Sequence, residues 1–600
     1  MASRRTVRGP VRPVRGLLVA LAAALAATGC VSMPTGGPVA SYPVTQGPGA
    51  QNQPYVQIVP NPPGANWKPE QIVQGFLTAS ASFGSDVALD YLTPQERKTW
   101  NPLWSAIVYK DGPKVTGGPA AVPGAKGTVT VRISGKEQAY LQGYGSYSVP
   151  LASAPDQSPD AEQTFQLVQV NKQWRISSAP QQLLLTSDSF NSDYQLRYLY
   201  FLDPSGRYLV PDPVYVPLRA TSADLMNGLV SDLISPPQDW LSGGATKTAL
   251  PRGTKISSVG PDGVTAVVNL TGAAIAKADG ATMRQVSAQL LWTLTFNAQS
   301  GSGGQSVQSV EVEVNGKPWT PSGQGNPVQR PSQAVLSAPT GAYPAFYYVD
   351  SDGYLTSRAG LAGQPSRIRQ IGTGFTQLAV SPDGRYLAAL RGGTLYTGLV
   401  ASGALDKRGT GYLSVSWDPD DDLWASAGSQ VVMFRNASGS SRPLAQQLAV
   451  EVNSPGARNL TIPFGQLRVA PDGVRVAIVY GGGNGVLTFG AISGQRGASP
   501  QIMLSQVELT PPGDTAFTGL SWYGPTNVIT LAGPGPVATE FPVSGGGSTS
   551  IPVDAGMQSI TASAGSVLVA GLPQGRIGSL ASLSGSWLPL GRGNSPSYPG

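Results

Sequence analysis

Hydrophobic residues near the start of the first folded region have the spacing of amphipathic helices. Pro69 suits the first turn of such a helix, because the N–H that proline lacks would be unsatisfied there anyway. Thr93-Pro94-Gln95-Glu96 has the pattern of a capping box and predicts a second helix that buries Trp100, Leu103 and Trp104. The apolar positions on one face of the first helix are Ile72, Val73, Phe76, Leu77 and Phe83.

The pattern then changes to that of strands. Runs at 128–133, 139–149 and 165–170 are strand-like, and Asn171-Lys172 predicts a tight turn into 174–176. Two helices followed by a curved antiparallel sheet, over residues 66–190, resemble the cone-shaped α+β fold of nuclear transport factor two-like proteins. Such a cone can hold a ligand, but we interpret the aromatic residues of this region as core.

The second region, residues 195–325, has the order β-β-α-β-β-α-β. Thr221-Ser222-Ala223-Asp224 predicts a capped helix, and Asn315-Gly316 is a hairpin signal. With the opening Leu199-Tyr200-Phe201-Leu202-Asp203, this order resembles the GerMN domain of sporulation and germination proteins. The expected elements are strands at 197–202, 208–216, 264–270 and 307–314, and helices at 221–234 and 283–294.

The last region, residues 335–600, contains a loose internal repeat. Leu378-Ala379-Val380-Ser381-Pro382-Asp383-Gly384-Arg385 leads into an apolar strand at 386–390, and later repeats begin at Leu413, Leu467, Leu520 and Ile560. The starts lie 35, 54, 53 and 40 residues apart, close to the length of a four-stranded propeller blade. The repeat predicts a β-propeller of five or six blades. A pair of β-sandwiches is the alternative, which the Ser-Pro-Asp-Gly turns disfavour.

The first 29 residues have the pattern of a secretory signal peptide. They hold five arginines and no acidic residue, followed by an apolar run at 17–27 that is too short for a membrane span. Ala27-Thr28-Gly29-Cys30 resembles a bacterial lipobox, although Ala27 stands where leucine is commonest. The resemblance implies that Cys30 carries a diacylglyceryl group; an unmodified cysteine after an ordinary signal is the alternative.

Two further features concern export and anchoring. Ser3-Arg4-Arg5-Thr6-Val7 resembles a twin-arginine signal, so general secretion and twin-arginine export both stay open. Residues 30–65 are rich in proline, glycine, glutamine and serine and predict a semi-extended tether. We therefore expect a protein anchored to the outer face of the cytoplasmic membrane.

Composition excludes several functions. The net charge of +6 includes the five arginines of the signal, so the remaining chain carries only +1, which argues against a nucleic-acid partner. There is no histidine, which removes histidine-dependent triads and nearly all zinc sites. We find no serine-hydrolase string and no phosphate loop, and a single cysteine forms no internal disulfide. We expect no cofactor, no metal and no enzyme, with a carboxylate-based hydrolase as the remaining catalytic alternative.

Three local motifs are candidate sites. Asp418-Pro419-Asp420-Asp421-Asp422 alternates acids like a calcium loop, but Leu423 and Ser429 stand where an EF-hand needs glycine and glutamate. We interpret it as a blade turn, and Gly481–Gly485 as a flexible loop. Trp417, Trp424 and Trp522 are expected to pack within blades rather than to form a sugar-stacking platform.

The lipobox, the α+β region, the GerMN-like unit and the propeller, in this order, resemble the LpqB lipoproteins of actinobacteria. The strings that carry the resemblance are 72–80, 90–94 and 378–386. It implies that the protein contacts the extracellular part of a membrane sensor kinase of the MtrB type. There it would modulate two-component signalling for cell-envelope homeostasis and division. A binder of cell-wall glycan or peptide is the alternative.

Overall fold

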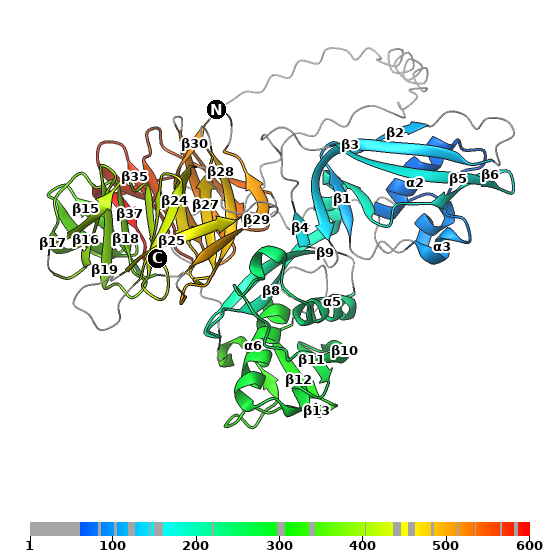
Figure 1. Ribbon diagram of the computed structural model, residues 1–600, viewed down its shortest axis with the longest axis horizontal. Helices are drawn as coiled ribbons and strands as arrows, with labels where there is room; N and C mark the ends of the chain where they lie inside the picture. Colours follow the sequence, from blue (N-terminus) through cyan, green and yellow to red (C-terminus); the bar gives the residue numbers. More distant parts are fainter. Residues whose placement is uncertain are drawn as a thin grey trace, which may run out of the picture. The chain divides into compact units, whose positions relative to one another are not determined.

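The computed structural model describes most of the chain after residue 59. The described ranges are 60–81, 86–100, 105–117, 127–142, 146–148, 160–218, 221–296, 307–334, 336, 343–402, 404–435, 446–453, 463–481, 485–497, 499–511, 513, 515–533, 536–545, 547–564, 567–580 and 586–600. Cys30, the signal and the tether lie outside these ranges. The order of two α+β domains followed by an all-β propeller is confirmed (Figure 1).

In the first domain a helix packs on a sheet of order β6-β5-β3-β1-β7, with β2 and β4 also paired to β3. Helix α2 lies against this sheet (Figure 1) and buries Ile72, Val73, Phe76 and Leu77 of the predicted face, whereas Phe83 lies outside the described residues. The β5–β6 turn is the predicted one, because Asn171 and Lys172 both have positive φ. The elements are α2 (Pro69–Ala81), η2 (Asp86–Tyr91), α3 (Glu96–Thr99), β1 (Ala106–Tyr109), β2 (Lys114–Gly117), β3 (Val129–Gln142), β4 (Ser146–Ser148), β5 (Asp160–Val170), β6 (Gln173–Ser178), β7 (Leu183–Thr186) and α4 (Ser187–Asp193).

The aromatic residues of this domain form its core, as the sequence indicated. The rings of Trp100 and Phe165 lie 5.2 and 5.8 Å from that of Phe76, both edge-on. Aromatic pairs in this arrangement add stability beyond the area they bury.

Two expectations for this domain were wrong in extent. The second helix, α3, is a single turn that stops at Thr99. Thr93 Oγ1 accepts from the Glu96 N–H at 3.2 Å, but the Glu96 carboxylate is engaged elsewhere, by the distant Ala179 N–H at 2.9 Å. The capping box is therefore only half formed. The strands expected at 128–133 and 139–149 are largely one strand, β3, and Leu103 and Trp104 lie outside the described residues.

The second domain follows the predicted order of strands and helices. Hairpin β8–β9 is one sheet, and β10-β11-β12-β13 is another, in which β11 and β12 are parallel and joined through α6. Thr221 caps α5 as expected, its hydroxyl accepting from the Asp224 N–H at 3.1 Å. The elements are β8 (Tyr194–Leu202), β9 (Leu209–Pro217), α5 (Ser222–Ile234), η4 (Asp239–Leu241), β10 (Lys255–Asp262), β11 (Thr265–Thr271), η5 (Ile275–Lys277), α6 (Gly280–Phe296), β12 (Ser309–Val314), β13 (Lys317–Pro318), β14 (Val328–Gln329) and η7 (Pro331–Gln333).

The propeller has six four-stranded blades. Four follow the chain in order, and the repeat starts at Leu378, Leu413, Leu467, Leu520 and Ile560 fall at or beside five innermost strands. Blades two to five are β18 (Gln377–Val380), β19 (Tyr386–Arg391), β20 (Thr394–Leu399), β21 (Asp406–Thr410); β22 (Ser414–Trp417), β23 (Leu423–Ala427), β24 (Gln430–Arg435), β25 (Gln446–Asn453); β26 (Phe464–Val469), β27 (Arg475–Tyr480), β28 (Val486–Ser493), β29 (Gln501–Leu509); and β30 (Ala516–Tyr523), β31 (Asn527–Gly533), β32 (Val537–Pro542), β33 (Thr549–Ile551).

The last strand closes the ring by serving two blades. The first half of β37 pairs with β36, placing Arg592 opposite Arg576, and the second half pairs with β15, placing Gly593 opposite Asp350. Blade one is thus built from both ends of the propeller sequence. Its strands are β15 (Ala345–Asp350), β16 (Tyr354–Ala359) and β17 (Ser366–Gln370), and those of blade six are β34 (Ser559–Thr561), β35 (Leu568–Leu572), β36 (Arg576–Leu580) and β37 (Leu588–Ser597).

We predict that Gly593→Ala destabilises the propeller. A Cβ atom there would lie 2.6 Å from Tyr348 Cδ2 and 2.7 Å from the Val349 carbonyl oxygen, so the closing strand must shift. The expected loss is about 1–3 kcal/mol, measured by calorimetric unfolding. Gly547→Ala is the control, because no heavy atom lies within 4 Å of its Cβ position. Equal unfolding temperatures for both variants and the wild type would contradict this account of closure.

Two carboxyl groups are buried in the second domain. Asp212 on β9 is 1% exposed, and the Gln238 N–H donates to its Oδ2 at 3.3 Å. Burial raises the pKa of Asp212 to about 7, opposed by the Gln238 hydrogen bond and the positive charge of Arg475. Burial also raises the pKa of Asp232 on α5 to about 8, and the charge of Asp212 adds to that shift. Neither Oδ1 has a hydrogen-bond partner among the described residues.

These groups predict a pH dependence of stability. Their folded-state pKa values lie above the ordinary 3.8, so the folded protein binds more protons between about pH 4 and 8. The stabilisation is present at the acidic end and is lost as the pH rises through 7 to 8. Relative to wild type, the Asp212→Asn, Asp232→Asn double variant should show a smaller fall in unfolding temperature from pH 5 to pH 8. If the unfolding temperatures of the two proteins fall equally from pH 5 to pH 8, the predicted role of these two carboxyl groups is refuted.

Candidate binding site in the propeller channel

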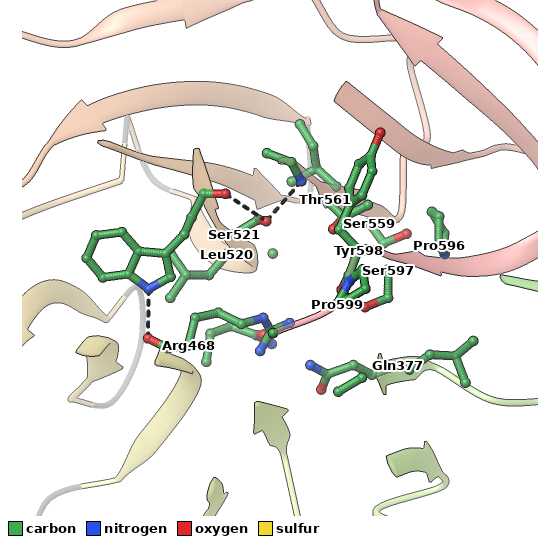
Figure 2. A pocket seen from close by; sticks show the side chains of 18 of the residues that line it. Gln377, Arg468, Leu520, Ser521, Ser559, Thr561, Pro596, Ser597, Tyr598 and Pro599 are labelled. Atoms are coloured by element: carbon green, nitrogen blue, oxygen red, sulfur yellow. Dashed lines mark hydrogen bonds between the residues drawn. The ribbon is translucent and has the colours of Figure 1, made fainter. Parts of the chain in front are cut away.

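The innermost strands of the propeller surround a cavity of about 280 Å³. All six blades contribute to its wall, through β18, β22 and the residue preceding it, β26, β30, β34 and the end of β37. Figure 2 shows side chains from several of these strands projecting toward the same space. The cavity lies on the axis where the blades meet.

Neighbouring innermost strands are joined by hydrogen bonds that involve side chains. Within the described residues, each of the six junctions has at least one such bond. In ring order they run from Gln377 Nε2 to Val415 O (3.1 Å), Ser414 Oγ to Leu467 O (3.1 Å), Trp522 Nε1 to Arg468 O (3.0 Å), Ala562 N to Ser521 Oγ (2.9 Å), Tyr598 N to Thr561 Oγ1 (3.1 Å) and Ser595 Oγ to Phe375 O (2.8 Å). These bonds fix the wall of the cavity.

Arg468 on β26 is the charged side chain of this wall. Its Nη1 donates to Ser414 Oγ and to the Leu467 carbonyl, both at 2.6 Å, and more weakly to the Val415 carbonyl at 3.3 Å. Burial lowers the pKa of Arg468 to about 10, so the group stays protonated at neutral pH. Figure 2 shows its side chain reaching into the space between Ser521 and Gln377.

The rest of the wall combines hydroxyl and amide groups with a few apolar side chains. Ser559, Thr561 and Ser597 line the side formed by blades six and one (Figure 2). Trp522 and Leu520 line the side formed by blade five. Such a wall can hold a small polar ligand by hydrogen bonds while a fixed positive charge orients one end.

The acidic motif is a blade turn, as interpreted from the sequence. Asp418 is buried, and its carboxylate accepts from the N–H groups of Asp420 and Asp422 and from Trp424 Nε1, at 2.9 to 3.0 Å. Burial raises the pKa of Asp418 to about 8, and the charge of Asp422 adds to the effect. The described residues contain no group of three or more His, Cys, Asp or Glu that could hold a metal ion.

The tryptophans pack within the blades, which confirms the prediction made for them from the sequence. Trp417, Trp424 and Trp522 are all buried, and each indole N–H donates to an oxygen of the protein. Edges of Trp417 and Trp522 nevertheless reach the cavity. In the glycine-rich loop only Gly481 and Gly485 lie in the described residues, so the prediction of flexibility stays untested.

Sequence reasoning did not find Arg468 or its neighbours. Their signal was present: Gln377, Arg468 and Ser521 each lie within one residue of a repeat start. The repeat was defined by its apolar residues, so the polar residues beside them were not compared between blades. Comparing the innermost strands would have shown that each of them carries a polar residue near the propeller axis.

Comparison with known proteins places this architecture in a class of multidomain lipoproteins with a propeller. Three family models match: the lipoprotein LpqB N-terminal domain at 62–191, sporulation and spore germination at 198–320, and the lipoprotein LpqB β-propeller domain at 367–599. Lipoprotein LpqB of Thermobifida fusca is 27% identical over 95% of this chain and 96% of its own. Lipoprotein LpqB of Streptomyces avermitilis is 28% identical over 84% of each.

The chain belongs to the LpqB lipoprotein family. Membership implies a lipid-anchored membrane lipoprotein. In the described part of the chain, no helix has the length and apolar character needed to cross a membrane. Among solved structures, TolB from Acinetobacter baumannii aligns with a TM-score of 0.31 at 14% identity, over 42% of this chain and 65% of TolB.

We predict that Asp418 stabilises blade three without calcium. Asp418→Ala leaves three donors without their acceptor and should lower the free energy of unfolding by about 2–4 kcal/mol. Asp418→Asn keeps one acceptor oxygen and should cost less. Adding calcium or a chelator should leave the unfolding temperature of the wild type unchanged. A rise with calcium that Asp418→Asn abolishes would show that the turn is a metal site after all.

Proposed function

We propose that this protein is a lipid-anchored accessory binding protein on the extracytoplasmic face of the membrane. It contacts the extracellular part of a sensor kinase of the MtrB type and modulates the two-component signalling that governs envelope homeostasis and division. The signal peptide of residues 1–29 directs export, and Cys30 carries the lipid. It acts by binding and catalyses no reaction.

The observation that carries this proposal is the domain content. A lipobox-like sequence and a proline-rich segment precede two α+β domains and a closed propeller, and 95% of the chain aligns with a relative that is named a lipoprotein. Propellers and small α+β domains offer broad, fixed surfaces for protein partners. A tether of some 35 residues would let those surfaces reach a neighbouring membrane protein.

The second domain and the propeller offer a shared surface. Trp240 and Leu241 of η4 belong to the same buried cluster as Phe517 and Phe541 of blade five. Tyr215 Oη donates to Ser544 Oγ at 3.1 Å, and Arg207 forms an ion pair with Asp420. We infer that a partner meets the two domains together, because separating them would expose this apolar cluster to water.

A binder of cell-wall glycan or peptide is the second candidate. The polar channel of the propeller favours it, since hydroxyl and amide groups there face an open cavity. Retention on purified peptidoglycan above that of a control protein tests it directly.

Cross-linking in the native host tests the main proposal. Membranes are treated with a mild cross-linker, solubilised in detergent, and the proteins recovered with this chain are identified by mass spectrometry. We expect a sensor kinase, recovered less well with Cys30→Ser because the unanchored protein leaves the membrane. Ser32→Ala, two residues away, is the matched control and should behave as wild type. Loss of the gene should also change phosphorylation of the response regulator. Recovery of wall fragments without any kinase would refute the proposal.

A further inference from the structure

Arg468 forms no ion pair with a carboxylate group of the described residues. It is the only charged side chain among the described residues that line the channel. No described Asp or Glu side chain, nor the terminal carboxylate of Gly600, lies within the 4.0 Å ion-pair distance of its guanidinium. Burial alone accounts for the lowered pKa, with no contribution from a nearby acid.

The contrast with Arg475, seven residues away, shows what is missing. Arg475 is 0% exposed, and its guanidinium is paired with Asp472 at 2.7 Å. A guanidinium withdrawn from water is normally paired in this way, because desolvation of the charge is otherwise uncompensated. Arg468 is only partly buried and has only neutral acceptors, which engage only its Nη1. The remaining donors of its planar fork face the channel (Figure 2).

The charge and size of the channel select the ligand. A single guanidinium matches a singly charged carboxylate, which it can bind with two parallel hydrogen bonds. A phosphate group carries more charge than one cation balances. The volume of about 280 Å³ lies at the lower end of small-molecule sites. Gln377, Ser521 and Thr561 already join neighbouring blades, yet each can form a further hydrogen bond of the kind peptide groups make.

We propose that the propeller channel binds the free carboxylate end of a peptide, one or two residues deep, with Arg468 as its counter-charge. The inference goes beyond the contact with a sensor kinase and does not depend on it. The same chemistry is offered by a free dipeptide and by the carboxyl end of a longer chain, so the test includes both.

The test uses the full-length protein in detergent and isothermal titration calorimetry. The probes are a panel of N-acetylated dipeptides with free carboxylates, the same dipeptides as terminal amides, and ten-residue peptides ending in the tightest-binding pair. We expect binding of the carboxylates at least tenfold tighter than that of the amides, because the amide loses the charge-assisted pair. Tighter binding of the long peptides would identify chain ends as the source, and equal binding would identify free dipeptides.

Matched variants then assign the charge. Arg468→Gln should weaken carboxylate binding tenfold or more and leave amide binding unchanged. The carboxylate affinity of Arg468→Lys should lie between those of the wild type and Arg468→Gln, since lysine keeps the charge but not the planar fork. Arg408→Gln, on the outer strand β21, is the control and should bind as wild type.

A variant at the rim covers the case in which Arg468→Gln does not fold. Leu413 lines the channel and is 52% exposed, so its replacement leaves the core intact. Leu413→Asp should weaken carboxylate binding several-fold by repulsion, whereas the neutral Leu413→Asn should not. The proposal is overturned if no carboxylate of the panel binds at about 10 mM, well above a millimolar Kd. It is also overturned if carboxylate and amide bind equally, or if Leu413→Asp and Leu413→Asn bind alike.

Discussion

Six innermost strands converge on one axis, and this constraint shapes the channel of the propeller. Within a blade each strand satisfies its backbone by pairing with the next, but across the junctions the described innermost strands form no ladder, apart from the single bridge between Val380 and Pro599. Side chains take over this role, as Ser414, Ser521 and Thr561 do at three of the junctions. The groups that hold the ring together are therefore the groups that make its channel polar. Stability and binding surface come from the same atoms.

The two arginines of blade four show how one pair of strands contributes both to the stability of the ring and to the polar wall of its channel. Arg475 on β27 is enclosed, paired with Asp472 and stacked on Trp522 at 5.3 Å, which is a structural arrangement. Arg468 on β26 contacts the same tryptophan through its backbone carbonyl, which accepts a hydrogen bond from the Trp522 indole N–H, and its side chain lines the cavity. Because Arg468 has no ion-pair partner among the described Asp and Glu side chains, its charge stays available at the channel wall.

Much of the fold could be predicted from periodicity and turn chemistry, because both are local. The face of α2, the Thr221 cap and the Asn171-Lys172 turn depend on residues a few positions apart. The extent of α3 could not, because a distant N–H engages the Glu96 carboxylate. The sequence repeat did not reveal blade one, because the innermost strand of this blade comes from the other end of the propeller sequence. The channel could not be predicted for a related reason: its wall combines residues of all six blades, which surround one cavity only in the closed ring.

The split blade also fixes the order in which the propeller can assemble. The chain is synthesised from its amino end, so β15 appears some 240 residues before its partner in β37. Until then β15 is an open sheet edge, able to pair wrongly with another copy. Blades two to five can form while the chain is still emerging, but the ring stays an open arc. Its completion waits for the second half of β37, so the pairing of that strand with β15 sets when the propeller becomes a closed ring.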